Sequence, residues 1–185
     1  MKIKKNGSWV VGKNDLGHAY VERMSEIIID IVKEEKPKLV YDFGCGYGQY
    51  ISNISKLGIE AVGFEAHPNK SFYRKIKKLD LSIPARLKNS ADISISLEVG
   101  EHIPVEFEQV FIDNVCNNTN NTVILSWAVE GQPGDGHVNC RNNDYIISEM
   151  AKRGFLFDPS ILETRKSFDV NHWFYNTTML FHKER

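Results

Sequence analysis

The sequence predicts an α/β fold built around a mostly parallel β-sheet. Apolar runs of strand length alternate along the chain with amphipathic runs of helix length. The first clear strand, residues 38–43, ends in a turn with glycines at 44, 46 and 48, and an amphipathic run over 48–57 follows. A strand that ends in a glycine-rich turn before a helix start forms a ligand crevice at the edge of such a sheet.

Composition limits the class of protein. The chain has 185 residues, enough for one domain with a sizeable core, and we expect a single domain without internal repeats. A net charge of −1 predicts no general attraction to nucleic acid or to anionic membranes. Three cysteines without metal-like spacing predict reduced thiols. No signal peptide opens the chain and no apolar run approaches membrane-spanning length, so we expect a cytoplasmic location and no membrane insertion.

The other elements follow from the same patterns. Residues 1–15 predict an irregular lead-in, and 16–35 predict a helix that ends at Lys36-Pro37. Further along we expect a strand at 60–65, a helix at 67–78, a short strand or strand exit at 79–82, a strand at 92–97, a helix at 104–116, an Asn-rich turn at 117–121, a strand at 122–126, a loop at 127–142, a helix from 142 or 143 to 153, and last strands at 155–157 and 173–182. The helix at 67–78 would carry a basic face, either solvated or in contact with an acidic substrate.

The glycine turn does not have the chemistry of the common phosphate sites. It lacks the Lys-Ser/Thr pair of a phosphate loop, and its glycine spacing is not that of the dinucleotide fingerprint. Asp42, directly before the turn, would repel a pyrophosphate and suits a ligand that carries positive charge. Glycines at Gly44 and Gly46 would let the backbone approach that ligand closely.

Three stretches in sequence resemble the class I S-adenosylmethionine (SAM)-dependent methyltransferases, type 11-like. They are Asp42-Phe43-Gly44-Cys45-Gly46-Tyr47-Gly48, then Ala61-Val62-Gly63-Phe64-Glu65, whose acid comes 23 residues after Asp42, and Ser96-Leu97-Glu98-Val99-Gly100-Glu101-His102-Ile103-Pro104. The resemblance covers about 38–126. It implies a Rossmann-like, seven-stranded sheet with the last strand antiparallel and helices on both faces. It also divides the chain into a lead-in and helix (1–35), a cofactor-binding half (38–126), and a substrate loop with C-terminal strands (127–185).

The resemblance implies SAM as the cofactor. Glu65 would accept the ribose hydroxyls, Asp42 would attract the methionine ammonium, and Glu98 would lie at the topological switch point of the sheet. Asp80 matches an acid that accepts the adenine amine, although a turn-forming Asp remains an alternative. The cofactor-binding residues that we predict are Asp42, Gly44, Cys45, Gly46, Glu65, Asp80, Leu81 and Glu98.

Two histidines are candidates for a general base. His137 lies in the long loop after the strand at 122–126, where flanking glycines would let the loop fold over a substrate and Asp135 could orient the ring. His102 follows Glu98 and Glu101, and its alternative role is a structural start to the next helix. Asp135 with His137 could also hold a divalent metal, but two ligands are too few to predict a metal site, and whether a metal assists is left open.

The acceptor is suggested by a looser similarity. Residues 96–139 are similar to methyltransferases of glycan and cell-surface polysaccharide synthesis, and the loop offers polar groups, including Arg141, beside the aromatic Trp127. The candidate substrate residues are His18, Tyr20, Gln132, Asp135 and Asn139. For His18 the alternative is a solvent-exposed His at a helix start, and for Tyr20 it is a core Tyr.

The predicted activity is methylation of a hydroxyl of a sugar, a glycan or a similar polar acceptor. Methylation of another small molecule or of a protein amine is an alternative, as is a catalytically silent SAM-binding partner subunit. A nicotinamide-dependent dehydrogenase is disfavoured by the glycine spacing, and a nucleic-acid modifier by the neutral charge balance. The short chain leaves the acceptor pocket open, which suits a long substrate or a homodimer that closes the site.

Overall fold

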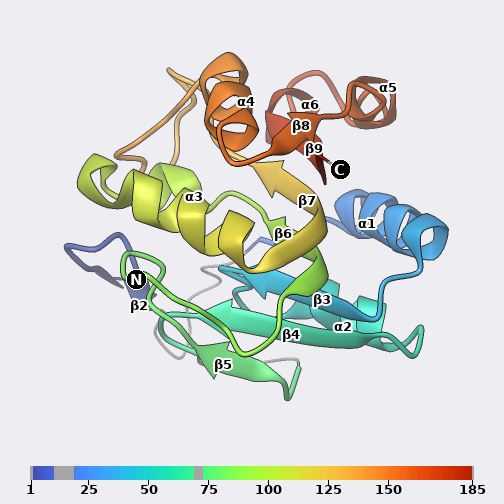
Figure 1. The fold of residues 1–185 in the computed structure, drawn as a ribbon. Coiled ribbons are helices and arrows are strands. Elements are labelled where there is room, and N and C mark those ends of the chain that lie inside the picture. The colour runs from blue at the N-terminus through green and yellow to red at the C-terminus, as the bar shows by residue number, and fades with distance from the viewer. Residues whose placement is uncertain (1, 11–18, 69–72, 185) are drawn as a thin grey trace.

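A seven-stranded sheet runs through the computed structural model, which describes residues 2–10, 19–68 and 73–184 (Figure 1). Its order is β5-β4-β3-β6-β7-β9-β8. The first five strands in this order are parallel, whereas β9 is antiparallel to both of its neighbours. The strands are β3 Leu39–Phe43, β4 Glu60–Glu65, β5 Ile76–Lys78, β6 Ala91–Ser96, β7 Thr119–Ser126, β8 Phe155–Phe157 and β9 Thr178–Lys183. The predicted α/β class and the seven-stranded, mostly parallel sheet are confirmed.

Helices cover both faces of this sheet (Figure 1). One face packs against α3 (Glu108–Asn117) and α4 (Asn143–Ala151), and the other against α1 (Glu22–Glu35), α2 (Gln49–Ser55) and α5 (Ile161–Arg165). Strand side chains alternate between the two cores: Val40 faces the α1 side, while Tyr41 and Phe43 face the α3 side. Burying a Phe43-sized side chain stabilises the fold by roughly 1.5–3 kcal/mol. Among the described residues, no helix has the length and apolar character needed to span a bilayer.

The expected helix over 67–78 is wrong in its described part. Residues 76–78 form the edge strand β5, which pairs in parallel with β4, and residues 69–72 lie outside the described structure. Sheet pairing overrides the local helical pattern, since the Gly63 N–H donates to the Lys75 carbonyl and the ladder continues from there. The exposed Lys77 and Lys78 therefore lie on a sheet edge, where charge discourages pairing with another chain.

Three smaller expectations also need correction. The lead-in is not wholly irregular, because β1 (Lys2–Ile3) and β2 (Trp9–Val10) pair in an antiparallel hairpin. The Asn-rich turn is shorter than expected, because β7 begins at Thr119, which pairs with β6. The last strand starts later than expected, because Trp173–Thr177 form the short helix α6, whose first turn is capped by the His172 ring.

The topological switch point of the sheet lies between β3 and β6. From β3 the chain moves outward through β4 and β5, then returns past β3 to β6 and β7. The 3₁₀-helices η1 (Gly100–His102) and η2 (Val105–Phe107) lead from β6 into α3. Loop 127–142 follows β7 without helix or strand, as expected. The carboxyl ends of these strands thus meet at one edge, where open α/β sheets form their crevice.

Candidate functional site

A cavity of about 340 Å³ lies at this edge of the sheet. That volume is in the range of small-molecule pockets. Its walls come from the ends of β3, β4 and β6, from the N-terminal hairpin, and from loop 127–142. The lining includes all eight residues predicted to bind a cofactor: Asp42, Gly44, Cys45, Gly46, Glu65, Asp80, Leu81 and Glu98. The topology therefore brings the predicted set together, although its role in binding stays a prediction.

The glycine turn is fixed by hydrogen bonds to the end of β4. The N–H groups of Gly44 and Cys45 both donate to the Phe64 carbonyl, at 2.9 and 3.1 Å, and the Gly46 N–H donates to Glu65 Oε2 at 3.1 Å. Gly44 has a φ of 79°, and a Cβ there would lie 2.4 Å from a methyl group of Val99. Both conformation and space require glycine, so the turn's backbone forms the cavity wall.

Asp42 is a buried carboxylate in this wall. Its side chain is 2% exposed, and Oδ2 has no hydrogen-bond partner in the part of the chain that the structure describes. Burial, reinforced by repulsion from Glu65, raises the pKa of Asp42 to about 8. A cation beside it would favour the ionised form. The Asp42 carboxyl group therefore lines the cavity without a positively charged partner among the described residues.

Two further acids, Glu65 and Asp80, also line the cavity. Glu65 accepts from the N–H groups of Gly46 and Ala66, yet burial outweighs these bonds and raises its pKa. Asp80 accepts from the N–H and hydroxyl of Ser82 and, at 2.8 Å, from the Asn6 amide. Burial acts to raise the pKa of Asp80, but these hydrogen bonds outweigh it and hold the pKa below its usual value. Asp80 therefore makes the hydrogen bonds of a turn-forming Asp. It also lines the cavity, as an acid that accepts the adenine amine would have to.

The two predicted histidines lie together around a third residue, Glu101. Glu101 Oε1 is 3.9 Å from His102 Nε2 and 4.0 Å from His137 Nε2, and the two rings are 5.1 Å apart at their centroids. Each ring is oriented by a backbone carbonyl: His102 Nδ1 lies 3.2 Å from the Gly136 oxygen, and His137 Nδ1 lies 3.1 Å from the Gln132 oxygen. In the sequence Glu101 is marked only as a neighbour of His102, because nothing local indicates its burial.

Negative charge accumulates beside this cluster. Burial and then the charge of Glu98 raise the pKa of Glu101 well above its ordinary value, and the N–H groups of Glu101 and Ala128 do not offset this. Burial likewise raises the pKa of Glu98, despite hydrogen bonds from Thr177 and Gln132. This end of the cavity therefore contains two buried acidic side chains, Glu98 and Glu101, beside the two histidines.

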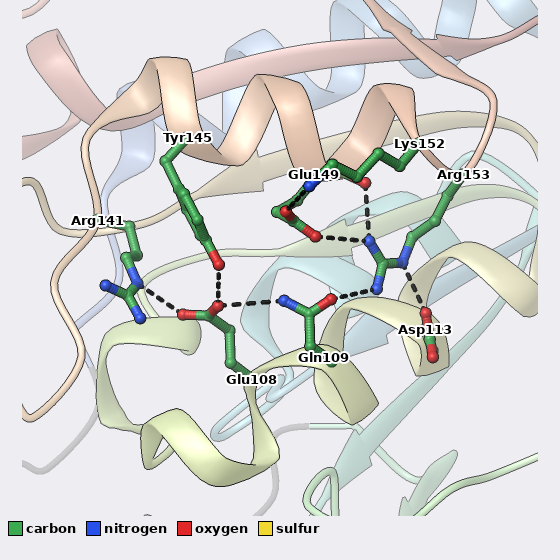
Figure 2. A network of polar contacts seen from close by, with 8 residues as sticks. All are labelled: Glu108, Gln109, Asp113, Arg141, Tyr145, Glu149, Lys152 and Arg153. Atoms are coloured by element: carbon green, nitrogen blue, oxygen red, sulfur yellow. Dashed lines mark hydrogen bonds and ion pairs between the residues drawn. The ribbon is translucent and has the colours of Figure 1, made fainter.

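Loop 127–142 is held in place by a polar network between α3 and α4 (Figure 2). Glu108, 2% exposed, accepts from Arg141 Nε at 2.7 Å, from Asn139 Nδ2 at 2.9 Å and from the Tyr145 hydroxyl. The backbone N–H groups of Val138 and Asn139 also donate to the Glu101 carbonyl. These contacts fix the segment that carries His137 next to Glu101.

The structure places several expected substrate residues away from the cavity. The Asn139 side chain is buried against Glu108, and neither Asn139 nor Arg141 lines the cavity. Trp127 is fully buried and donates to the Asn139 carbonyl, so it cannot offer an aromatic face. The Tyr20 hydroxyl accepts from Asn53 and its ring packs on Tyr50, and it too lies outside the lining. His18 lies outside the described residues.

Other residues line the cavity that the sequence analysis did not select. Gln132 and Asp135 are there as expected, but Trp173 and Phe174 of α6 supply aromatic surface, and Asn6 and Trp9 come from the N-terminal hairpin. The Trp9 ring packs edge-on against His102 at 4.6 Å between centroids. Only the isolation of Trp9 in a polar stretch could have drawn attention to it. The others needed the tertiary fold.

No protein-family model and no curated protein matches the chain. Solved structures match it over nearly its whole length. Magnesium protoporphyrin IX methyltransferase from Synechocystis PCC 6803, with bound S-adenosylhomocysteine (SAH), has a TM-score of 0.64 at 15% identity over 91% of this chain and 90% of that one. The sugar N-methyltransferase KedS8 from Streptoalloteichus sp ATCC 53650 has a TM-score of 0.66 at 11% identity over 96% and 99%.

The methyltransferase domain of a bacterial Hen1, CtHen1-CN, has a TM-score of 0.65 at 16% identity over 89% of this chain and 98% of that one. The chain has the Rossmann-like methyltransferase fold. At such low identities the similarity establishes the fold alone. The methyltransferase fold of this chain carries Asp42, Glu65 and the glycine turn at one crevice, and their chemistry has to be argued from the site itself.

The buried Asp42 predicts a pH dependence of stability. An unfolded Asp ionises near pH 3.8, whereas the folded chain keeps the Asp42 proton up to about pH 8. Between these values the folded state binds more protons, so ionisation favours unfolding and stability falls as pH rises. We expect Asp42→Asn to flatten this fall between pH 5 and 8, and to raise the free energy of unfolding at pH 8 by at least about 1 kcal/mol. Chemical denaturation at several pH values measures both.

The exposed Asp30 provides the matched control. Asp30→Asn should leave the slope of stability against pH as in the wild type. Equal slopes for wild type and Asp42→Asn would contradict the assignment of a buried, protonated Asp42.

The network around Glu108 predicts coupling between stability and the loop. Glu108→Ala leaves four donors without their acceptor, those of Gln109, Asn139, Arg141 and Tyr145, and we expect a loss of roughly 2–4 kcal/mol in the free energy of unfolding. Hydrogen exchange in 127–142 should accelerate with it. Glu163→Ala, which breaks an exposed pair with Lys166, should change neither. Unchanged exchange in Glu108→Ala would show that other contacts hold the loop.

Proposed function

We propose that this chain is a SAM-dependent methyltransferase. The observation that carries the proposal is the buried Asp42 carboxylate, without a partner for Oδ2 among the described residues, at a glycine turn that approaches a ligand-sized cavity. Among the described lining residues are six carboxylates and no Lys or Arg: Asp42, Glu65, Asp80, Glu98, Glu101 and Asp135. A ligand with positive charge suits such a wall, and SAM carries a sulfonium and an ammonium.

The lining supports one orientation of SAM. Asp42 would hold the ammonium at the methionine end, and the turn at Gly44 would allow close approach. Glu65 retains lone pairs for ribose hydroxyls, because each oxygen accepts one backbone N–H. Asp80 and the buried Leu81 would receive the adenine end.

The acceptor that we propose is a hydroxyl of a sugar, a glycan or a similar polar molecule. The cavity continues to Gln132, Asp135 and His137, and the rings of Trp173 and Phe174 lie in the same lining. Polar groups match hydroxyls, and aromatic faces match the C–H surfaces of a sugar. One protein of similar fold is a sugar methyltransferase by name, and another a porphyrin methyltransferase. The fold is thus compatible with a sugar without selecting it.

The chemistry asks little more than positioning and proton handling. When bound, SAM supplies a methyl group already activated by its positive sulfur. The chain would align the acceptor oxygen with that carbon and exclude water. His137 and His102, grouped around Glu101 at the acceptor end, are the residues that we assign to the hydroxyl proton.

Calorimetric titration with SAM and SAH, with NAD as control, tests the proposed cofactor. We expect micromolar binding of both sulfur ligands and none of NAD. Asp42→Asn and Glu65→Ala should weaken SAM binding at least about tenfold each. Wild-type protein that binds neither SAM nor SAH would overturn the proposal.

The histidine assignment predicts a separation of binding from turnover. His137→Ala should bind SAM like the wild type and lose about 100-fold or more of methyl transfer, since proton handling typically contributes that much. Transfer of radiolabelled methyl from SAM to a panel of monosaccharides and oligosaccharides measures it. His182→Ala, at the other end of the sheet, should retain activity. Full turnover by His137→Ala would refute its role.

A further inference from the structure

The geometry points to a divalent metal site formed by Glu101, His102 and His137 at the acceptor end of the cavity. All three ligand atoms lie within 4.8 Å of one another. The two Nε2 atoms approach the same carboxylate oxygen at 3.9 and 4.0 Å. The site's proposed catalytic use rests on the proposed function, whereas metal binding itself does not.

These distances suit a shared ion better than direct hydrogen bonds. A hydrogen bond between imidazole and carboxylate needs about 2.7–3.2 Å, so Glu101 does not orient either ring as it would orient a general base. A metal ion lies about 2.1 Å from its nitrogen and oxygen ligands, so two ligand atoms up to about 4.2 Å apart can share one ion. Three ligands of one tetrahedral ion are about 3.4 Å apart, so each pair in the cluster has to approach by roughly half an ångström or more.

The orientation of the rings supports the same conclusion. Each Nδ1 faces a backbone carbonyl oxygen, which can only accept a hydrogen bond. In the neutral rings Nδ1 therefore carries the proton and Nε2 presents its lone pair toward Glu101. Donation of the second ring N–H to a carbonyl is the usual arrangement of histidines that bind metals.

Glu101 supplies a second, independent observation. It is fully buried, and neither carboxylate oxygen has a hydrogen bond of good geometry from the described residues. The N–H groups of Glu101 and Ala128 lie near the carboxylate but do not offset its burial. A buried carboxylate without such partners is costly unless a cation compensates it. The described lining contains no Lys or Arg that could do so, and Glu98 adds negative charge nearby.

The position of His137 is built for this contact. A Cβ at Gly134 would lie 2.2 Å from His137 Nε2, so only glycine leaves room for the ring there. The sequence alone offers only Asp135 beside His137 as metal ligands. The fold brings Glu101 and His102 of η1, more than 30 residues away in sequence, next to His137 instead.

The ligand set also suggests the kind of ion. Two imidazoles and one carboxylate suit Mn²⁺, Co²⁺, Fe²⁺ or Zn²⁺ better than Ca²⁺ or Mg²⁺, which prefer oxygen ligands. Such an ion would polarise the acceptor hydroxyl and lower its pKa. The acceptor oxygen then bonds to the methyl carbon, the C–S bond breaks with its electron pair remaining on sulfur, and the hydroxyl proton passes to water. With the ion bound, the histidines act as its ligands, and water takes the hydroxyl proton that we assign to the histidines in the metal-free site.

Titration of the full, chelator-treated chain with Mn²⁺ or Co²⁺, in the absence of SAM, tests the site. We expect one ion per chain at micromolar affinity by calorimetry, and nitrogen couplings from imidazoles in the electron paramagnetic resonance of the bound ion. His102→Ala, His137→Ala and Glu101→Gln should each weaken binding at least about tenfold. His182→Ala, distant from the cavity, is the matched control and should bind like the wild type.

The readouts separate this inference from the proposed function. Glu101→Gln removes charge and keeps shape, so it should retain or raise the melting temperature while losing the metal. SAM binding without metal binding in the wild type would overturn the metal site and leave the methyltransferase proposal intact. Metal binding without SAM binding would do the reverse. A bound ion without nitrogen couplings, or unchanged affinity in all three folded variants, would also refute the site.

Discussion

Buried negative charge at the open edge of the sheet is the constraint on which this site depends. Asp42 and Glu101 are both buried carboxylates with oxygens that have no hydrogen bond of good geometry from the described residues. Burial of a carboxylate is costly, and the cost persists until positive charge arrives. The two acids stand at separate parts of one cavity. In our account one receives the ammonium of a cofactor and the other a metal ion, so binding relieves a destabilisation that the fold carries when empty.

The fold creates this arrangement by bringing together strand ends that are distant in sequence. Asp42 lies at the end of β3, Glu65 at the end of β4, and Glu101 in the turn after β6. Loop 127–142 completes the cavity. It is held both by the acid Glu108 in α3 (Figure 2) and by backbone hydrogen bonds to the Glu101 carbonyl. In our account the sheet therefore positions the proposed cofactor end, while the polar network between α3 and α4 helps to position the proposed acceptor end.

Much of the cofactor end could be predicted from sequence, because its signals are local. The strand, the acid and the glycine turn occupy one continuous stretch, and the next acid follows at the spacing of one βαβ unit. The acceptor end could not be predicted as well. Asn139 and Trp127 occur in a polar loop, yet both are buried, Asn139 against Glu108 and Trp127 against Phe111. The local pattern at β5 predicts a helix, because the pairing with β4 that makes it an edge strand is a tertiary contact.

A crystal structure of the chain grown with SAH and Mn²⁺ would test the account most directly. The account predicts that the ribose lies against Glu65 and the ammonium against Asp42, with an anomalous manganese peak between Glu101, His102 and His137. SAH density elsewhere on the molecule, or an occupied SAH site whose ammonium avoids Asp42, would contradict the central claim that buried carboxylates select a cationic ligand here.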